Sequence, residues 1–424
     1  MTTLDGGGRV VTEAIPSVRS AAIGLWIGAG SRDEDGAHAG VSHFLEHLLF
    51  KGTRSYSALE IAEVFDGFGG ELNASTARDY TVVYARVLDE HVEKALDVMT
   101  DMVYAPSFTD IDSEREVVLE EIAMIEDSPQ ELVHDLFAEA VFRDHPLGRP
   151  VLGSAEVISS VSKRALSAYH RSRYRPSSIV VAAAGSVDHE HLVATVGDMT
   201  SKRLNGGSRR PPARPPFVAP PPPALRFQRK DTEQYHVCLG APGIARSDRR
   251  RFAASILDSV LGGSASSRLF QEIREKRGLA YSVYTFASQY ADTGKIGVYV
   301  GTREENVAAC LDILAAEIAA VADGALRDEE VERAKENLKG RVMLSMEVTS
   351  NRMSRLGKSL VTDSDLLTLD QILAEIEAVD AAAVGELARH LLAPEGLSAA
   401  GIGPDEDRFV TAVERIAPGL AAAA

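Results

Sequence analysis

The apolar positions of the chain group into segments that predict both strands and helices. Residues 9–30 predict two strands broken at Pro16, and residues 80–87 and 179–185 predict one strand each. The run 41–50 contains neither Gly nor Pro and predicts a mostly buried helix, capped by Ser42 or an earlier turn residue. Further helices are predicted at 57–68, 89–103, 110–126, 129–142, 162–172 and 188–198.

The composition changes sharply after residue 205. Eight of the 18 prolines fall between Pro211 and Pro223, after Gly206-Gly207-Ser208. Such a segment is typical of an extended, semi-rigid spacer between domains. We therefore predict a linker at 206–224.

Beyond the linker the order of elements repeats. The strand at 235–243 corresponds to the one that ends at Gly30, and the closing strand at 397–403 corresponds to 179–185. The helices at 304–321 and 327–339 correspond to 89–103 and 109–121. Because the same order of elements occurs twice, the sequence predicts two copies of one domain, at 1–205 and 225–424. Because strands and helices come in clusters, we expect an α+β fold in which helices cover a largely antiparallel sheet.

Composition and charge exclude several classes of protein. The formal net charge of −17 argues against nucleic-acid binding, which needs a basic surface. No apolar run approaches the length of a membrane helix, so we expect no membrane partner. The two cysteines, Cys238 and Cys310, are too few for a disulfide framework and are expected to be small buried residues. With no secretory signal at the N-terminus, the expected location is cytoplasmic.

The chemistry of the chain concentrates in the helix predicted at 41–50. His43 and His47 are four residues apart and lie on one helical face, with Glu46 beside them. Two imidazoles at this spacing can both bind one zinc ion, and Glu46 is then placed to deprotonate a water. The string His-x-x-Glu-His is an inverted zinc-protease motif. The alternative, two core histidines and a stray acid, would leave three ionisable groups on an apolar helix without compensation.

A catalytic zinc site needs a third protein ligand. The helix at 110–126 is rich in acids, and its apolar stripe has Glu114 and Glu121 on its border, while Glu116 and Glu120 point away. Carboxylates are seldom buried unless they are paired or bind a metal, so Glu114 and Glu121 are the candidates for the ligand and its supporting partner. Helical geometry alone does not order these two. The second copy has no such motif, since residues 252–261 contain no His.

Four strings together resemble the pitrilysin and mitochondrial processing peptidase family, and in particular its bacterial single-length members. They are His43-Phe-Leu-Glu46-His47, Phe50-Lys-Gly-Thr53, Gly69-Gly-Glu-Leu-Asn-Ala74 and Glu114-Arg-Glu-Val-Val-Leu-Glu-Glu121. The resemblance implies that Glu121 is the third zinc ligand and that Glu114 supports the site by contacting a ligand.

The same resemblance implies two further functional pairs. Asn73 and Ala74 would lie on a strand that pairs with the substrate, which an exposed sheet edge allows through main-chain hydrogen bonds. Arg274 and Tyr281, in the string Arg274-Glu-Lys-Arg-Gly-Leu-Ala-Tyr281, would assist at the zinc site of an opposing domain. From the residues alone, that string predicts only the end of a helix at Gly278.

The sequence therefore predicts a zinc endopeptidase with one Zn²⁺ per chain, which hydrolyses peptides or unfolded segments inside a chamber. Glu46 would act as the general base. Family members of double length contain four such domains, so the resemblance implies a homodimer in which the partner chain supplies Arg274 and Tyr281. Two alternatives are a non-catalytic relative, like the core subunits of respiratory complexes, and a zinc-dependent module that binds peptides without cutting them.

Overall fold

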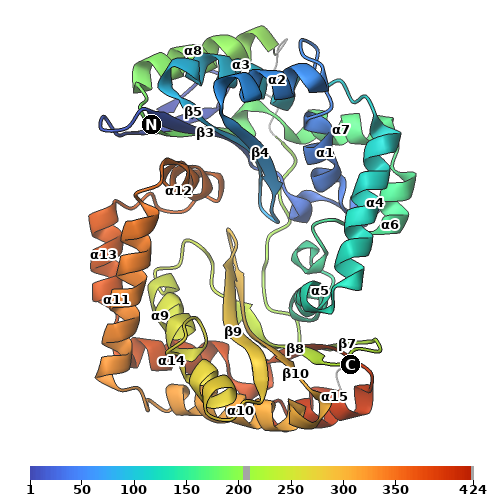
Figure 1. Cartoon of the computed structure of the whole chain (residues 1–424), viewed down its shortest axis with the longest axis vertical. Coiled ribbons are helices and arrows are strands. Elements are labelled where there is room, and N and C mark those ends of the chain that lie inside the picture. Colours follow the sequence, from blue (N-terminus) through green and yellow to red (C-terminus); the bar gives the residue numbers. More distant parts are fainter. Residues whose placement is uncertain (204–210, 422–424) are drawn as a thin grey trace. The chain divides into compact units, whose positions relative to one another are not determined.

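The two halves of the chain form two sheets that share one strand order (Figure 1). The computed structural model describes residues 1–203 and 211–421. The first sheet has the order β1-β2-β6-β3-β5-β4 and the second the order β7-β11-β8-β10-β9. In each sheet one pair is parallel, β2 with β6 and β7 with β11, and the other pairs are antiparallel. Apart from β1, each strand of the first sheet has a counterpart in the second, so the predicted repeat of an α+β domain with a largely antiparallel sheet is confirmed.

The strands follow the predicted positions closely. Residues 179–185 form β6 as predicted, and the predicted break at Pro16 separates β2 from β3. The strands are β1 Thr2–Thr3, β2 Arg9–Ala14, β3 Ser20–Ile27, β4 Glu71–Thr76, β5 Thr81–Leu88, β6 Ile179–Gly185, β7 Leu225–Arg229, β8 Tyr235–Gly243, β9 Ala280–Gln289, β10 Gly294–Thr302 and β11 Ser398–Gly403.

Contacts divide the chain into two compact units, which are interleaved along the sequence. Unit 1 comprises Met1–Ala123, Pro150–Pro215 and Leu344–Leu366, and unit 2 comprises Met124–Arg149, Pro216–Met343 and Leu367–Ala424. The predicted domains 1–205 and 225–424 divide the chain by its sequence repeat instead, and their bounds stay a prediction. The two divisions differ mainly because each half of the sequence contributes one helix to the other unit, α5 to unit 2 and α12 to unit 1.

All predicted helices are present, and each begins or ends within two residues of the prediction. The helix α8 continues past the predicted end at 198 to Arg203, and α6, α9 and α12–α15 were not predicted. The helices are α1 Val41–Leu49, α2 Ala58–Phe68, α3 Val92–Tyr104, α4 Ile111–Asp127, α5 Pro129–Phe142, α6 Ala155–Ser160, α7 Lys163–Arg173, α8 His189–Arg203, α9 Arg251–Leu261, α10 Val307–Ala322, α11 Asp328–Ser345, α12 Thr349–Val361, α13 Leu369–Glu377, α14 Ala381–Leu391 and α15 Glu406–Val413. No helix among the described residues is long and apolar enough to cross a membrane.

The sheet of unit 1 is covered on both faces, which explains why β3 is buried along almost its whole length. Alternate residues of a strand face opposite sides of the sheet. Ile23, Leu25 and Ile27 pack in the cluster that contains α1 and α3, whereas Trp26 packs in the cluster that contains α12. The indole Nε1–H of Trp26 donates to the Met353 sulfur at 3.4 Å. The core of unit 1 therefore holds α1, which carries the histidines, firmly against the sheet.

The predicted linker contains a segment, 211–215, that is fixed to unit 1. Its first part, Gly206-Gly207-Ser208, lies outside the described residues. Further on, the guanidinium of Arg214 pairs with Asp33 at 2.9 Å and with Asp79 at 3.0 Å, and both carboxylates are almost fully buried. Buried carboxylates need such partners. The end of the linker that lies in unit 1 is thus tied down by ion pairs, in addition to the stiffness that its prolines confer.

Candidate metal centre

The helix α1 begins at a turn that only glycine adopts without strain. Gly40 has φ of 93°, and a Cβ atom there would lie 2.3 Å from the carbonyl oxygen of Leu152. The buried carboxylate of Glu34 accepts hydrogen bonds from the N–H groups of Gly40 at 2.8 Å and Ser42 at 2.6 Å. The predicted cap by an earlier turn residue is confirmed as Gly40, and Glu34, which the sequence did not single out, satisfies the free N–H groups.

The apolar face of α1 fixes the direction of its polar face. Phe44, Leu45 and Leu48 are fully buried, whereas the side chains of His43 and His47 are 13% and 17% exposed to solvent. The two imidazole rings lie 4.7 Å apart between centroids. Because the helix is held by its buried residues, both histidines present ring nitrogens to the same point.

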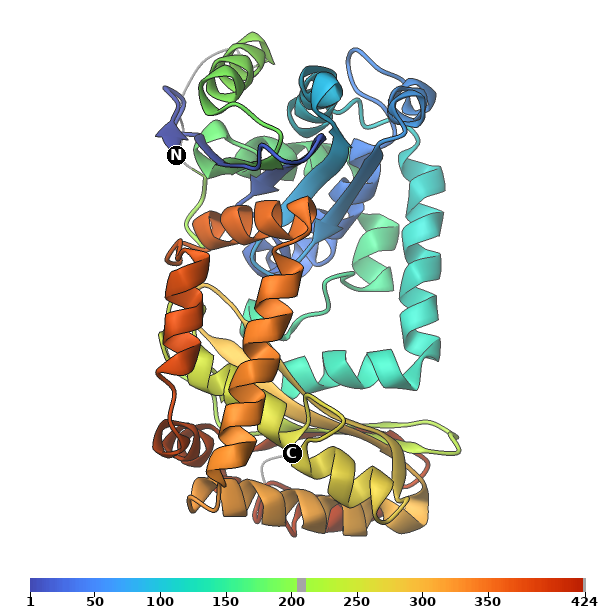
Figure 2. The ribbon, with the colours of Figure 1, turned by 60° about the vertical axis from the view of Figure 1, so that its left-hand side comes forward.

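The helix α4 brings the acidic residues to this point. Glu114 is buried and Glu121 is half-buried, while Glu116 and Glu120 are exposed, as the helical pattern predicts. Arg115 anchors the helix, since its guanidinium donates to the carbonyl oxygens of Ile158 and Val161, at the end of α6. Figures 1 and 2 show α6 beside α4.

Three side chains meet in the geometry of a metal site. His43 Nε2 and His47 Nε2 lie 3.3 Å apart, and they lie 3.5 and 3.4 Å respectively from Glu121 Oε2. Tetrahedral zinc ligands at about 2.0–2.1 Å from the metal are about 3.3 Å from one another. Within residues 1–203 and 211–421, this is the one group of three His, Cys, Asp or Glu side chains whose ligand atoms lie within 4.8 Å of each other.

The protonation states of the two histidines fit a cation at this point. His47 Nδ1 donates to Glu114 Oε1 at 3.1 Å, which leaves the lone pair of Nε2 directed at Glu121. Burial lowers the pKa of the His43 imidazole to about 4, so His43 is neutral at pH 7. Two imidazole nitrogens and a carboxylate oxygen that converge on one point are the donor set of a zinc site. The residues present therefore fit zinc.

Glu46 lies beside this group and is not bound to it. Burial raises the pKa of the Glu46 carboxyl, and hydrogen bonds from the Thr76 hydroxyl and backbone partly offset the rise. Its Oε2 atom is buried and has no hydrogen-bond partner among the described residues. A poorly solvated carboxylate oxygen with a free lone pair is a good proton acceptor.

The strand with Asn73 and Ala74 is an edge of the first sheet. β4 pairs with β5 on one side only, and Asn73 Oδ1 accepts a hydrogen bond from the Ala74 N–H at 2.8 Å. Beside β4 lies a pocket of about 680 Å³, which α2 lines with Ile61 and Phe65. The edge and the pocket together offer main-chain groups and apolar walls to an extended chain.

Arg274 and Tyr281 lie together in unit 2. Phe270–Glu275 forms a π-helical turn, and Gly278, with φ of 60°, ends it as predicted. The Arg274 guanidinium lies 4.7 Å from the centroid of Phe270 and 4.5 Å from that of Tyr281, so it is held between two rings. Tyr281 is 77% exposed, which leaves its hydroxyl open to solvent.

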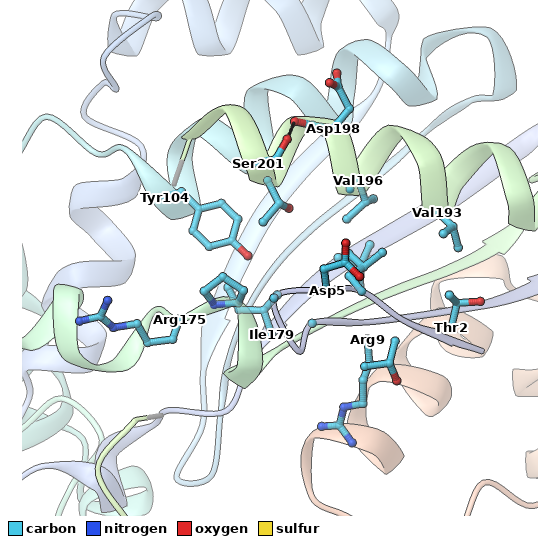
Figure 3. Close-up of a pocket in the computed structure, with 18 residues that line it drawn as sticks. Thr2, Asp5, Arg9, Tyr104, Arg175, Ile179, Val193, Val196, Asp198 and Ser201 are labelled. Carbon is cyan, nitrogen blue, oxygen red and sulfur yellow. Dashed lines mark hydrogen bonds between the residues drawn. The ribbon is translucent and has the colours of Figure 1, made fainter. Parts of the chain in front are cut away.

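Sequence reasoning missed two residues that bear on the metal centre. Lys51 forms an ion pair with Glu114 at 2.6 Å, and Thr76 contacts Glu46. Lys51 stands in the string Phe50-Lys-Gly-Thr53, so the family resemblance contained a signal for it. A separate cavity of about 620 Å³, between the β1–β2 hairpin and α8, is lined by residues such as Tyr104 and Val196 and contains none of the predicted site residues (Figure 3).

Comparison with known proteins agrees with this geometry. The family model described as "Insulinase (Peptidase family M16)" matches residues 9–155, and "Peptidase M16 inactive domain" matches residues 160–338. An uncharacterized zinc protease of Streptomyces coelicolor is 46% identical over 418 residues, which cover 96% of this chain and 90% of that protein. This chain belongs to peptidase family M16. The predicted resemblance is confirmed, and the relatives' names support a zinc metallopeptidase in general.

Other M16 relatives extend the likeness. An uncharacterized zinc protease of Bacillus subtilis is 41% identical over 92% of this chain and 94% of its own length. The crystal structure of a protease from Helicobacter pylori has a TM-score of 0.89 at 22% identity and covers 95% of this chain and 98% of that one. At this identity the likeness shows the M16 fold alone. The match of the inactive-domain model includes residues 252–261, where the second copy has no His.

Proposed function

We propose that this M16 chain is a zinc endopeptidase that cleaves peptides or unfolded segments, with one zinc ion per chain. The observation that carries the proposal is the convergence of His43, His47 and Glu121 at 3.3–3.5 Å. When bound there, zinc polarises the scissile carbonyl and makes water acidic enough to attack at neutral pH. Three protein ligands would leave one coordination position for water or substrate, as catalytic zinc sites require.

Glu46 carries the proton transfers in this proposal. Its unpartnered Oε2 accepts a proton from the attacking water and then delivers it to the nitrogen of the leaving amine. Glu114 holds the His47 ring through Nδ1, so that Nε2 stays directed at the metal position. These roles use five side chains on α1 and α4, two helices that pack in the core of unit 1.

The edge strand β4 binds the substrate in this proposal. An extended peptide adds to the edge at Asn73 and Ala74 through main-chain hydrogen bonds, which give affinity with little sequence preference. Asn73 Oδ1 already occupies the Ala74 N–H, so the peptide has to displace that side chain. The pocket beside β4, whose wall includes Phe65 together with the acidic residues Asp66 and Glu71, then receives one substrate side chain.

We also propose that the active enzyme is a homodimer that encloses a chamber and acts in the cytoplasm. In this dimer the partner chain supplies Arg274 and Tyr281 to the zinc site. Two features support such a composite site: the zinc ligands and the Arg274/Tyr281 pair lie in different units, and the Arg274 guanidinium is already fixed against the Tyr281 ring. Neither cysteine forms a disulfide, which is compatible with a reducing compartment.

A mixing experiment tests the dimer. Glu46→Gln and Arg274→Ala/Tyr281→Phe, each inactive alone, are combined under conditions of subunit exchange. Completion in trans restores about a quarter of wild-type activity, by counting sites in a symmetric dimer. If mixing restores nothing, the composite site across two chains is wrong.

The function itself is tested by zinc analysis joined to cleavage of a quenched peptide library, with and without chelator. We expect cleavage that chelator abolishes and zinc restores, and we expect a stable folded protein to be spared. Zinc content without chelator-sensitive cleavage would favour a peptide-binding module instead. A chain that binds no zinc would favour the non-catalytic alternative.

A further inference from the structure

Lys51 lies directly after the helix that carries both candidate histidine ligands. Its N–H donates to the Leu48 carbonyl at 3.2 Å, and its own carbonyl accepts from Thr109 Oγ1 at 2.7 Å. The backbone of Lys51 is therefore tied both to the end of α1 and to the segment that leads into α4. These are the two helices that supply the metal site.

The side chain of Lys51 reaches the carboxylate that supports His47. Lys51 Nζ lies 2.6 Å from Glu114 Oε2, while Glu114 Oε1 accepts from His47 Nδ1 at 3.1 Å. The Glu114 side chain is 7% exposed and that of Lys51 is 35% exposed. Because each oxygen of this carboxylate has its own partner, the two contacts together fix the plane of the carboxylate.

We propose that Lys51 is a positioning residue for the metal site. It holds Glu114 in the orientation in which Glu114 Oε1 accepts the hydrogen bond of His47 Nδ1, so that His47 Nε2 stays directed at Glu121. A buried carboxylate that loses its cation is destabilised and turns toward other partners. The inference rests on the proposed zinc site and adds a residue to it.

The sign of the effect on zinc affinity distinguishes this role from a purely electrostatic one. A lysine near a divalent cation repels it, so that loss of the charge alone would strengthen zinc binding. Loss of orientation weakens it, and removal of an outer partner of a ligand typically costs about 10–100-fold in metal affinity. We expect the second effect to dominate, because Glu114 stands between Lys51 and His47.

The test measures the zinc dissociation constant by competition with a chromophoric chelator, in the full-length chain. Lys51→Met should weaken binding about 10–100-fold, and Lys51→Arg, which keeps the ion pair, should restore most of it. The matched control is Lys163→Met, since Lys163 Nζ donates to the Phe108 carbonyl at 2.8 Å in the same unit without touching the site. It should leave zinc affinity unchanged.

A double-mutant cycle with Glu114→Gln tests whether Lys51 affects zinc binding through the Glu114 carboxylate. Lys51→Met should add little to the loss caused by Glu114→Gln, because it acts through that carboxylate. Equal or tighter zinc binding by Lys51→Met, a comparable loss in Lys163→Met, or full additivity in the cycle would each overturn the proposal. If the wild type binds zinc and cleaves peptides while Lys51→Met binds zinc normally, only the role of Lys51 fails and the proposed function stands.

Discussion

His47 Nδ1 lies 3.1 Å from Glu114 Oε1, a contact between residues 67 positions apart in the sequence. The hydrogen bond fixes which ring nitrogen carries the proton and turns the other toward His43 and Glu121. It exists because α1 and α4 each bury an apolar stripe in the core of unit 1. The candidate metal site is thus a consequence of how two amphipathic helices pack.

Removal of a ligand should remove the metal. His47→Ala and Glu121→Ala each leave two ligands, so we expect bound zinc to fall from about one ion per chain to near zero after dialysis. The matched control is Glu120→Ala, which removes an exposed carboxylate next to Glu121. Zinc content is measured by elemental analysis, and full retention of zinc by Glu121→Ala would show that the third ligand is wrong.

Much of this site followed from the sequence because helical spacing fixes which residues share a face. His43 and His47 lie on one face of α1, as their spacing predicts. Glu114 and Glu121 are more buried than Glu116 and Glu120, as the apolar stripe of α4 predicts. Contacts between distant segments did not follow from periodicity. The cap from Glu34, the ion pair of Lys51 with Glu114 and the exchange of α5 and α12 all depend on tertiary packing.

The packing of α12 on the first sheet depends on a glycine. A Cβ atom at Gly357 would lie 2.0 Å from Trp26 Nε1, and Trp26 is buried and cannot move aside. Gly357→Ala should therefore lower the free energy of unfolding by about 1–3 kcal/mol. Trp26 is the single tryptophan of the chain, so its fluorescence during urea unfolding follows this contact directly.

The matched control for this prediction is another helical glycine. Gly340, in α11, has nothing within 4 Å of its Cβ position. Gly340→Ala should raise the free energy of unfolding by about 0.5–1 kcal/mol, measured by circular dichroism, because alanine favours the helix. Equal effects of the two substitutions would contradict the close contact at Gly357.

The stability of the chain should depend on pH through His170. Burial lowers the pKa of His170 to about 4, although its hydrogen bond with the Val103 carbonyl opposes the shift. A histidine in an unfolded chain has a pKa of about 6.5. Between pH 6.5 and 4 the unfolded chain binds a proton that the folded chain does not. Stability therefore falls as the pH falls through this window, by at most about 1.4 kcal/mol per pH unit.

His170→Gln removes this contribution. Its free energy of unfolding should decline less steeply than that of the wild type between pH 6.5 and 4, in urea titrations with chelator present. His390→Gln, which changes an exposed histidine, serves as the control and should follow the wild-type slope. Parallel curves for the wild type and His170→Gln would contradict the pKa shift of His170.

We propose that Glu46 transfers protons at the metal site without binding the metal itself. Glu46→Gln keeps the shape of the side chain and all three ligands. The decisive measurement is therefore the cleavage rate of a quenched peptide by purified Glu46→Gln, with zinc content determined on the same sample. We predict about one zinc ion per chain and a rate at least about 100-fold below wild type. Near wild-type cleavage with zinc bound would contradict the account.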